Sequence, residues 1–422
     1  MRLTVTNKTN GLVMLPNPIG KGIRPNSTKV FDNVDPIDMA KQSEVWSSME
    51  DSGVIAFTSN DDPEVPDQIE AVTEESLISH YKLNVDHVSG DDSIATGSLS
   101  NPFRTIQAAL DYAADMTLIG SYTTVEINIP EIKSTEALVY NGLNRIILRG
   151  EGIVSFIAPP AGQVPLTITN ATKDSLATYR ASGLYSDLVN QGDAGPSLVS
   201  IHSVYFSGSG GANAIEVLGV AGDAGPGLTN FGYFRMESSY INGTVYCRNT
   251  RSISAITMKN WGRYTFHNCS YMTFMHTMAR HYIVSYDAAD PEGQPASGSN
   301  FLQGYDVHQW GDLTATGDCA VWFWSGHTDG NISISDTSSA LFNGYGCSGN
   351  LDINGTATVE HTEGYVGGNV NAEAGSSWRS NGVHVQGALS FDAGVGTARM
   401  DGGRYMGALT DPGGKFVRNA GN

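Results

Sequence analysis

Gly349-Asn350-Leu351 is one copy of a Gly-Asp/Asn-aliphatic triplet that recurs every 19 residues in the C-terminal part of the chain. The other copies are Gly311-Asp312-Leu313, Gly330-Asn331-Ile332 and Gly368-Asn369-Val370, and Gly387-Ala388-Leu389 keeps the spacing. A fixed period of this length is typical of repeat folds, in which each unit buries its apolar face by stacking on its neighbours. The sequence therefore predicts a mainly β fold, a parallel β-helix (solenoid) with coils of about 19 residues after about residue 205.

A second repeated position supports the same period. Val321-Trp322-Phe323 and Ala340-Leu341-Phe342 are also 19 residues apart, and each alternates between the two faces of a strand. Neighbouring strands in a sheet lie about 4.8 Å apart, so roughly ten coils would make a rod about 50 Å long. We predict regular coils over about 230–286 and 311–410 and a Pro- and Gly-rich extruded coil over 287–310.

Asparagine recurs at the turns between these predicted strands. An Asn side chain at a repeated turn can hydrogen-bond along the stack as a ladder, and an adjacent Gly permits the positive φ of a tight corner. We interpret six asparagines as ladder residues with a structural role: Asn230, Asn249, Asn268, Asn331, Asn350 and Asn369.

Composition excludes several classes of partner. The chain has 49 Gly but only 24 Lys plus Arg, and its formal net charge is −19, which repels nucleic acid and anionic lipid. It contains no run of 18 apolar residues and no secretory signal pattern at its start. We therefore expect no nucleic-acid partner, no membrane partner and synthesis in a host cytoplasm.

Three segments precede the predicted rod. Residues 1–57 predict a small domain with strands at 2–6, 12–15 and 54–57 and one helix that Asp35 and Pro36 begin and Gly53 ends. Residues 58–80 are acidic and poor in apolar side chains, which is typical of an extended linker, and 81–422 is assigned to the β-helix. Within 97–115, Asn101 before Pro102 predicts the cap of a short amphipathic helix.

The stretch from Gly90-Asp91-Asp92 to Leu110, with Asn101-Pro102-Phe103-Arg104-Thr105, resembles the entry segment of bacteriophage pectate-lyase-like parallel β-helix proteins, including tailspikes. The resemblance implies a helix that covers the N-terminal end of a right-handed solenoid, and a homotrimer. Residues 1–57 also resemble small domains that attach phage structural proteins to the particle. The implied partners are therefore other copies of this chain and, through residues 1–57, a major capsid protein or tail adaptor.

Catalytic chemistry has weak support in the sequence. Glycan hydrolysis needs two carboxyl groups at a fixed separation, and we name Asp287, Asp290 and Glu292 in the extruded coil as weak candidates only. Further acids are spread along the chain, and we interpret them as a solvated surface: Asp306, Asp312, Asp318, Glu360, Glu363 and Glu373. The family's lyases use Asp-bound calcium and an Arg base, and no dense Asp set with a nearby Arg occurs at coil spacing. We expect no metal and no cofactor.

We assign no catalytic or metal-binding role to the following histidines and cysteines. We interpret His308, His327 and His361 as solvated or ladder side chains. The four cysteines, Cys247, Cys269, Cys319 and Cys347, lack metal-ligand spacing and are expected to be small buried side chains.

Aromatic side chains concentrate near Trp322 and Trp324. Alternation places both on one face of a strand, with Val321 and Phe323 on the other. The tryptophans could pack against another subunit of a trimer, stack on a sugar or lie under a loop.

Together these features predict a structural protein of the virion surface. The first hypothesis is a homotrimeric capsid decoration or head fibre that is anchored by residues 1–57 and projects its β-helix outward, with host-surface adhesion as a role. The alternative is a tailspike that binds or cleaves host surface polysaccharide. A free secreted polysaccharide lyase is a third possibility, disfavoured by the lack of a signal pattern.

Overall fold

The structure is a computed structural model that describes residues 2–8, 13–14, 22–23, 28–31, 55–60, 80–116, 124–142, 144–169, 198–219, 231–269, 271–286 and 300–419. The chain divides into two compact units, Met1–Tyr81 and Lys82–Asn422.

The first unit contains a small antiparallel sheet. Strand β1 (Arg2–Asn7) pairs with β4 (Thr28–Phe31) on one side and with β5 (Ile55–Asn60) on the other, and β2 (Val13–Met14) pairs with β3 (Gly22–Ile23). Strands β1, β2 and β5 lie close to the strands predicted at 2–6, 12–15 and 54–57, whereas β3 and β4 were not predicted and β5 continues to Asn60, inside the stretch predicted as a linker. The predicted helix between Asp35 and Gly53 lies outside the described residues.

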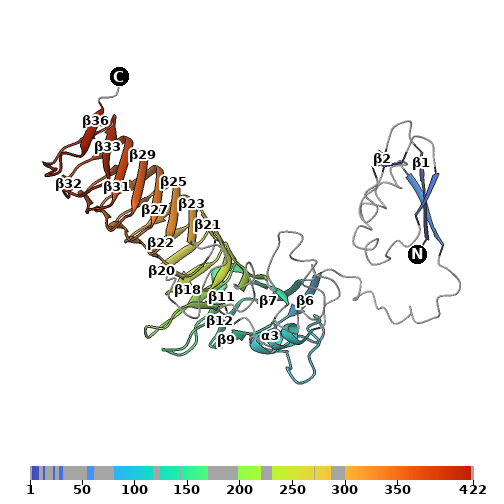
Figure 1. The fold of residues 1–422 in the computed structure, drawn as a ribbon. Helices are drawn as coiled ribbons and strands as arrows, with labels where there is room; N and C mark the ends of the chain where they lie inside the picture. Colours follow the sequence, from blue (N-terminus) through green and yellow to red (C-terminus); the bar gives the residue numbers. More distant parts are fainter. Residues whose placement is uncertain are drawn as a thin grey trace. The chain divides into compact units, whose positions relative to one another are not determined.

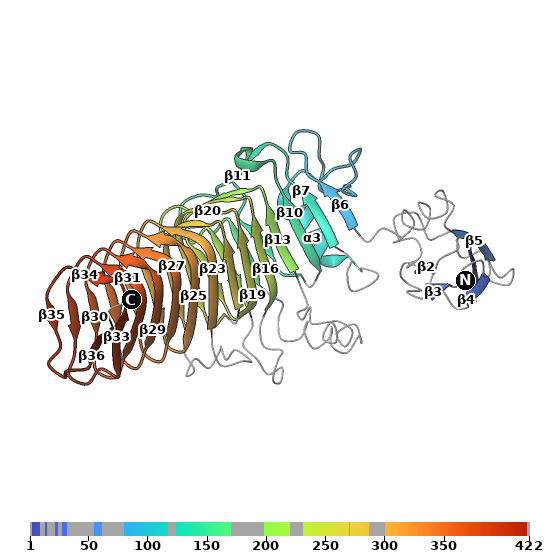
Figure 2. The same ribbon diagram turned by 90° about the horizontal axis from the view of Figure 1, so that it is seen from above.

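The second unit is a long stack of parallel coils with three faces (Figures 1 and 2). Face 1 contains β7 (Thr124–Asn128), β10 (Arg145–Arg149), β13 (Leu198–His202), β16 (Phe231–Glu237), β19 (Thr250–Ile256), β21 (Tyr271–Met275), the first parts of β23 (Asn300–Gln309), β25 (Cys319–Thr328), β27 (Ser339–Cys347), β29 (Thr358–Val366) and β31 (Ser377–Val385), then β33 (Thr397–Asp401) and β36 (Phe416–Asn419).

Face 2 contains β8 (Ile132–Ser134), β11 (Ser155–Ile157), β14 (Tyr205–Ser207), β17 (Tyr240–Asn242), the first parts of β20 (Lys259–His267) and β22 (Met278–Ser285), the last parts of β23 to β31, and β34 (Arg404–Tyr405). Face 3 contains β9 (Leu138–Tyr140), β12 (Leu166–Thr169), β15 (Ile215–Leu218), β18 (Val245–Arg248), the last parts of β20 and β22, then β24 (Leu313–Thr316), β26 (Ile332–Ile334), β28 (Leu351–Ile353), β30 (Val370–Ala372), β32 (Leu389–Phe391) and β35 (Leu409–Thr410).

The pairing register follows the sequence period. Leu313 pairs with Ile332, Ile332 with Leu351, and Leu351 with Val370, so each triplet begins the face-3 strand of a new coil. The prediction of a mainly β chain is confirmed, and the long sheet of parallel strands is consistent with a β-solenoid.

Two predicted boundaries differ from the structure. Parallel pairing begins at β7, well before residue 205. The 19-residue repeat did not reveal these early coils, because partners such as Leu148 and Ile201 are much more than 19 residues apart. Residues 300–309, expected in the extruded coil, form β23 with regular pairing to β21 and β25, while 287–299 lie outside the described residues.

Alternating burial builds the interior of the stack. Large aromatic side chains fill it in successive coils, including Tyr264, Phe274, Tyr282 and Phe323, with ring centroids 5.1 Å apart between Tyr264 and Tyr282. The buried Tyr345 hydroxyl bonds to Thr328 Oγ1 at 2.7 Å and accepts from Gln309 Nε2 at 3.0 Å, which satisfies its polar group. All four cysteines are buried and free, as expected.

The single described α-helix, α3 (Ile106–Asp115), covers the first coil (Figure 1). It buries Ile106, Ala109 and Leu110, and Gln107 exchanges two 2.8 Å hydrogen bonds with the backbone of Val139 on β9. The predicted cap is wrong: the N-cap is Thr105, whose hydroxyl accepts from the Ala108 N–H. Asn101 lies in a preceding turn, where its side chain donates to the Ile94 carbonyl. Asp92 accepts the Arg104 and Thr105 N–H groups and so fixes the entry to the helix.

Candidate functional site: the outer surface of face 1

Face 1 carries a row of outward aromatic side chains. On β25, Val321 and Phe323 are buried while Trp322 remains 39% exposed, so the two sets lie on opposite faces as predicted and Trp322 is on the outer one. Rings from neighbouring coils contact one another across the strands: Tyr271 with Phe301 at 5.4 Å, Phe301 with Trp322 at 4.9 Å, and Tyr305 with Trp324 at 4.9 Å between centroids. The strands therefore present these rings as one nearly continuous aromatic surface.

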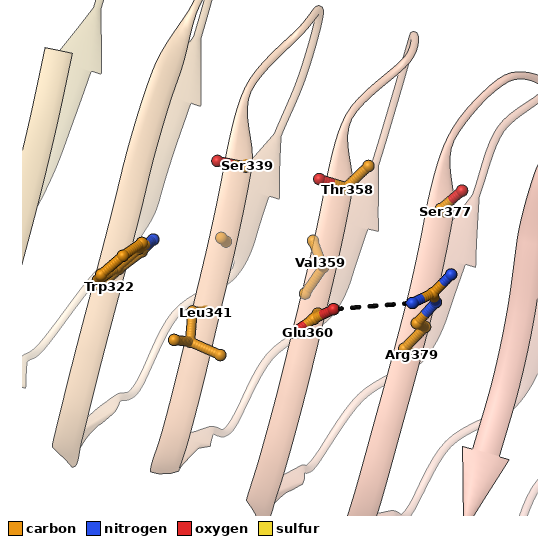
Figure 3. A pocket seen from close by; sticks show the side chains of 9 residues that line it. Trp322, Ser339, Leu341, Thr358, Val359, Glu360, Ser377 and Arg379 are labelled. Carbon is orange, nitrogen blue, oxygen red and sulfur yellow. Dashed lines mark ion pairs between the residues drawn. The ribbon is translucent and has the colours of Figure 1, made fainter. Parts of the chain in front are cut away.

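Beyond Trp322 the same face is hollowed (Figure 3). We call this depression of about 380 Å³ the face-1 hollow, and it is lined by Trp322, Ser339, Ala340, Leu341, Thr358, Val359, Glu360, Ser377 and Arg379. Figure 3 shows Trp322, Leu341, Glu360 and Arg379 in one line across successive strands, with the hydroxyl residues in a second line beside them.

Register creates both lines. Trp322 pairs with Leu341, Leu341 with Glu360, and Glu360 with Arg379, so a side chain at one strand position meets its equivalent in the next coil. The sequence interpretation named Trp322 and Glu360 separately and missed that the 19-residue step joins them to Arg379. The same period that predicts the fold could have found this site.

The hollow combines an apolar wall with polar groups. Glu360 and Arg379 approach to 4.0 Å, and their side chains are 60% and 62% exposed, so water screens the pair and it contributes little to stability. Such groups remain available to a ligand. The arrangement can bind a molecule that has an apolar surface and polar edges.

The described ladder asparagines occupy two different corners. Asn331 Oδ1 accepts the Asn350 N–H at 2.9 Å, Asn350 Oδ1 accepts the Asn369 N–H at 2.8 Å, and Asp312 begins the series by accepting from Asn331 at 2.7 Å. These bonds join a side chain to the backbone of the next coil, at the corner before face 3.

Asn249 and Asn268 are placed differently. They lie at the corner before face 1, buried, with φ of 52° and 51°. Because the two sets share a period but not a phase, the five described residues do not form one ladder, and Asn230 lies outside the described residues.

The named acids have separate surroundings. Asp287, Asp290 and Glu292 lie outside the described residues. Asp306 lies between His276 at 3.0 Å and His308 at 3.4 Å, and its pKa is lowered chiefly by the hydrogen bond from His276. Asp312 belongs to the ladder and Glu360 lies beside Arg379, so these two acids and Asp306 occupy different places on the stack.

The three named histidines differ in burial. His308 is exposed, and His327 Nε2 lies 2.9 Å from a carboxylate oxygen of Asp329. His361 is 1% exposed, which excludes the solvated alternative of its interpretation, and burial lowers its pKa to about 4. Within the described ranges, no group of three or more His, Cys, Asp or Glu side chains is placed to hold a metal ion.

Comparison with known proteins gives no relative: no family model, no curated protein and no solved structure matches the chain. Among the described helices, none has the length and apolar character needed to cross a membrane.

Proposed function

We propose that the protein is a homotrimeric rod on the surface of a bacteriophage particle, attached by residues 1–57, and that the face-1 hollow contacts saccharides of the host surface. The hollow beside Trp322 is the observation that carries this proposal. Support for an anchor and a projecting part comes from the division of the chain into two compact units with the acidic stretch 58–80 near their boundary.

A saccharide matches the chemistry of the hollow. A sugar ring has an apolar C–H face, which packs on an aromatic ring such as Trp322, and hydroxyls at its edges, which pair with groups such as Thr358, Glu360 and Arg379. Repeated coils also suit a repeated ligand, because equivalent hydroxyl residues recur at Ser339 and Ser377 along the stack.

Titration of the purified full chain with host surface polysaccharide tests the adhesive part of the proposal. We expect Trp322→Ala to weaken binding about tenfold or more, as loss of a central aromatic contact does. Trp310→Ala is the matched control, since Trp310 is 44% exposed and lies outside the hollow. Equal binding by the wild type and Trp322→Ala would refute the assignment of the hollow.

Imaging of particles tests the location. A capsid decoration should occupy many sites on the shell, whereas the alternative, a tailspike, should form a ring of a few trimers at the tail. Absence of the protein from purified particles would refute both.

A further inference from the structure

Face 2 carries a second aromatic surface, on earlier coils than the face-1 hollow. We define the face-2 stripe as Ile153, Val154, Phe156, Tyr205, Tyr240 and Trp261. These residues line an open depression of about 790 Å³. Ile153 is 59% exposed and Trp261 is 47% exposed, so large apolar side chains meet solvent.

Strand register aligns three rings of the stripe. Phe156 pairs with Tyr205, and Tyr205 with Tyr240, in successive coils. Phe156 and Tyr205 meet edge to face at 4.7 Å, and Tyr240 stacks on Trp261 at 6.0 Å with an interplanar angle of 18°. Rings that already support one another lose little conformational entropy when a partner covers them. Contiguous exposed apolar surface of this kind marks an interaction site.

We propose that the face-2 stripe is the contact between copies of this chain in the trimer. The inference rests on the homotrimer of the proposed function and assigns that trimer a surface. In a closed parallel assembly, symmetry places each coil at the same height as its equivalent in the neighbouring copy. A stripe that runs along the stack and faces the threefold axis therefore meets the stripes of the other two copies at that axis over its whole length.

The same symmetry separates the two aromatic surfaces. The stripe ends at Trp261, whereas the face-1 row begins at Tyr271 and continues through Phe301 to Trp322 on later coils. Because equivalent coils share one height, the row of one copy cannot cover the stripe of the next. Contact through the stripe thus leaves the hollow beside Trp322 open to a ligand.

Charge supports a second copy as the occupant. Each chain carries a formal charge of −19, so copies approach most easily where acidic side chains are few. At the first coil of the stripe, Glu131 and Lys133 are both exposed and only two residues apart. Rotation about a threefold axis brings Lys133 of one copy and Glu131 of the next to the same height, which favours the parallel arrangement.

Sedimentation of the full chain tests the proposal. The wild type should be a trimer, and the double variant Trp261→Ser with Tyr240→Ser should raise the dissociation constant about tenfold or more, with an unchanged β-type circular dichroism spectrum. Trp322→Ser is the matched control and should remain trimeric. If the double variant remains a trimer, the assignment of the stripe is overturned but the homotrimer of the proposed function is not. If the wild type is a monomer, both are overturned.

Disulfide trapping gives a second test that leaves the aromatic residues in place. The four native cysteines are buried, so Ile153→Cys would add an exposed thiol at the stripe. Mild oxidation should link copies through this residue. Met406→Cys is the control, since Met406 is 72% exposed and lies far along the stack. Disulfide-linked copies of the Met406→Cys variant with none of the Ile153→Cys variant would overturn the inference. It would also be overturned if Trp261→Ser abolished saccharide binding and left the trimer unchanged.

Discussion

Acidification should destabilise the coil stack through the buried imidazole of His361. Its Nε2 lies 2.9 Å from the Tyr345 carbonyl oxygen, so this nitrogen carries the proton and donates. Nδ1 is buried and has no hydrogen-bond partner among the described residues. Protonation would place a second N–H and a positive charge in the interior beside the Phe342 ring, which explains why burial lowers the pKa from 6.5 to about 4.

The sign and size of the effect follow from linkage. Because the folded-state pKa is below the unfolded-state value, the unfolded chain binds the proton first, and stability is lost as the pH falls from about 6.5 to about 4. A difference of about 2.5 pKa units corresponds to about 3 kcal/mol in full, of which about 2 kcal/mol is lost between pH 7 and pH 5.

Urea unfolding of the wild type and His361→Gln at both pH values measures this loss. Gln can keep a donor toward Tyr345 and cannot titrate, so the variant should lose about 2 kcal/mol less between pH 7 and pH 5. His384→Gln, an exposed change on the next coil, controls for removal of an imidazole as such. If both variants track the wild type between the two pH values, His361 is not protonated on unfolding and the reasoning is wrong.

Three further predictions concern the ladder, the anchor and chemistry. Asn350→Leu leaves the Asn369 N–H without its acceptor at an exposed corner and should lower the free energy of unfolding by about 1 kcal/mol. Asn350→Asp keeps an acceptor and should lower it less. Equal melting temperatures of the wild type and Asn350→Leu would show that this hydrogen bond does not stabilise the stack. Deletion of residues 1–57 should leave a folded stack that no longer joins particles, and loss of its circular dichroism spectrum would contradict independent folding. Incubation of the protein with host polysaccharide should release no new reducing ends. If cleavage is observed, and substitution of Asp287, Asp290 or Glu292 abolishes it, the result would favour the tailspike.

The repeat was predictable because it is a local, periodic signal. A Gly-Asn-aliphatic triplet every 19 residues requires only that equivalent positions share a turn, and the structure pairs those positions coil to coil. Alternation likewise placed Trp322 and Phe323 on opposite faces of their strand, since successive side chains in a strand point to opposite faces, and burial in the stack shows that Trp322 is on the outer face.

The start of the entry helix, the early coils and the corners of the asparagines depended on contacts between segments that the sequence does not place side by side. The entry helix begins at Ile106, after its cap Thr105, because Asp92 accepts the Thr105 N–H and holds the preceding backbone, and the early coils were hidden because their lengths vary. The asparagines divide between two corners because a shared 19-residue spacing does not determine at which corner of the coil each set lies. Sequence determined the coil and which side chains of a strand share a face, but only stacking decided which face is outward and which side chains become neighbours: register joins Trp322 to Arg379 in the hollow and keeps the stripe ending at Trp261 on other coils.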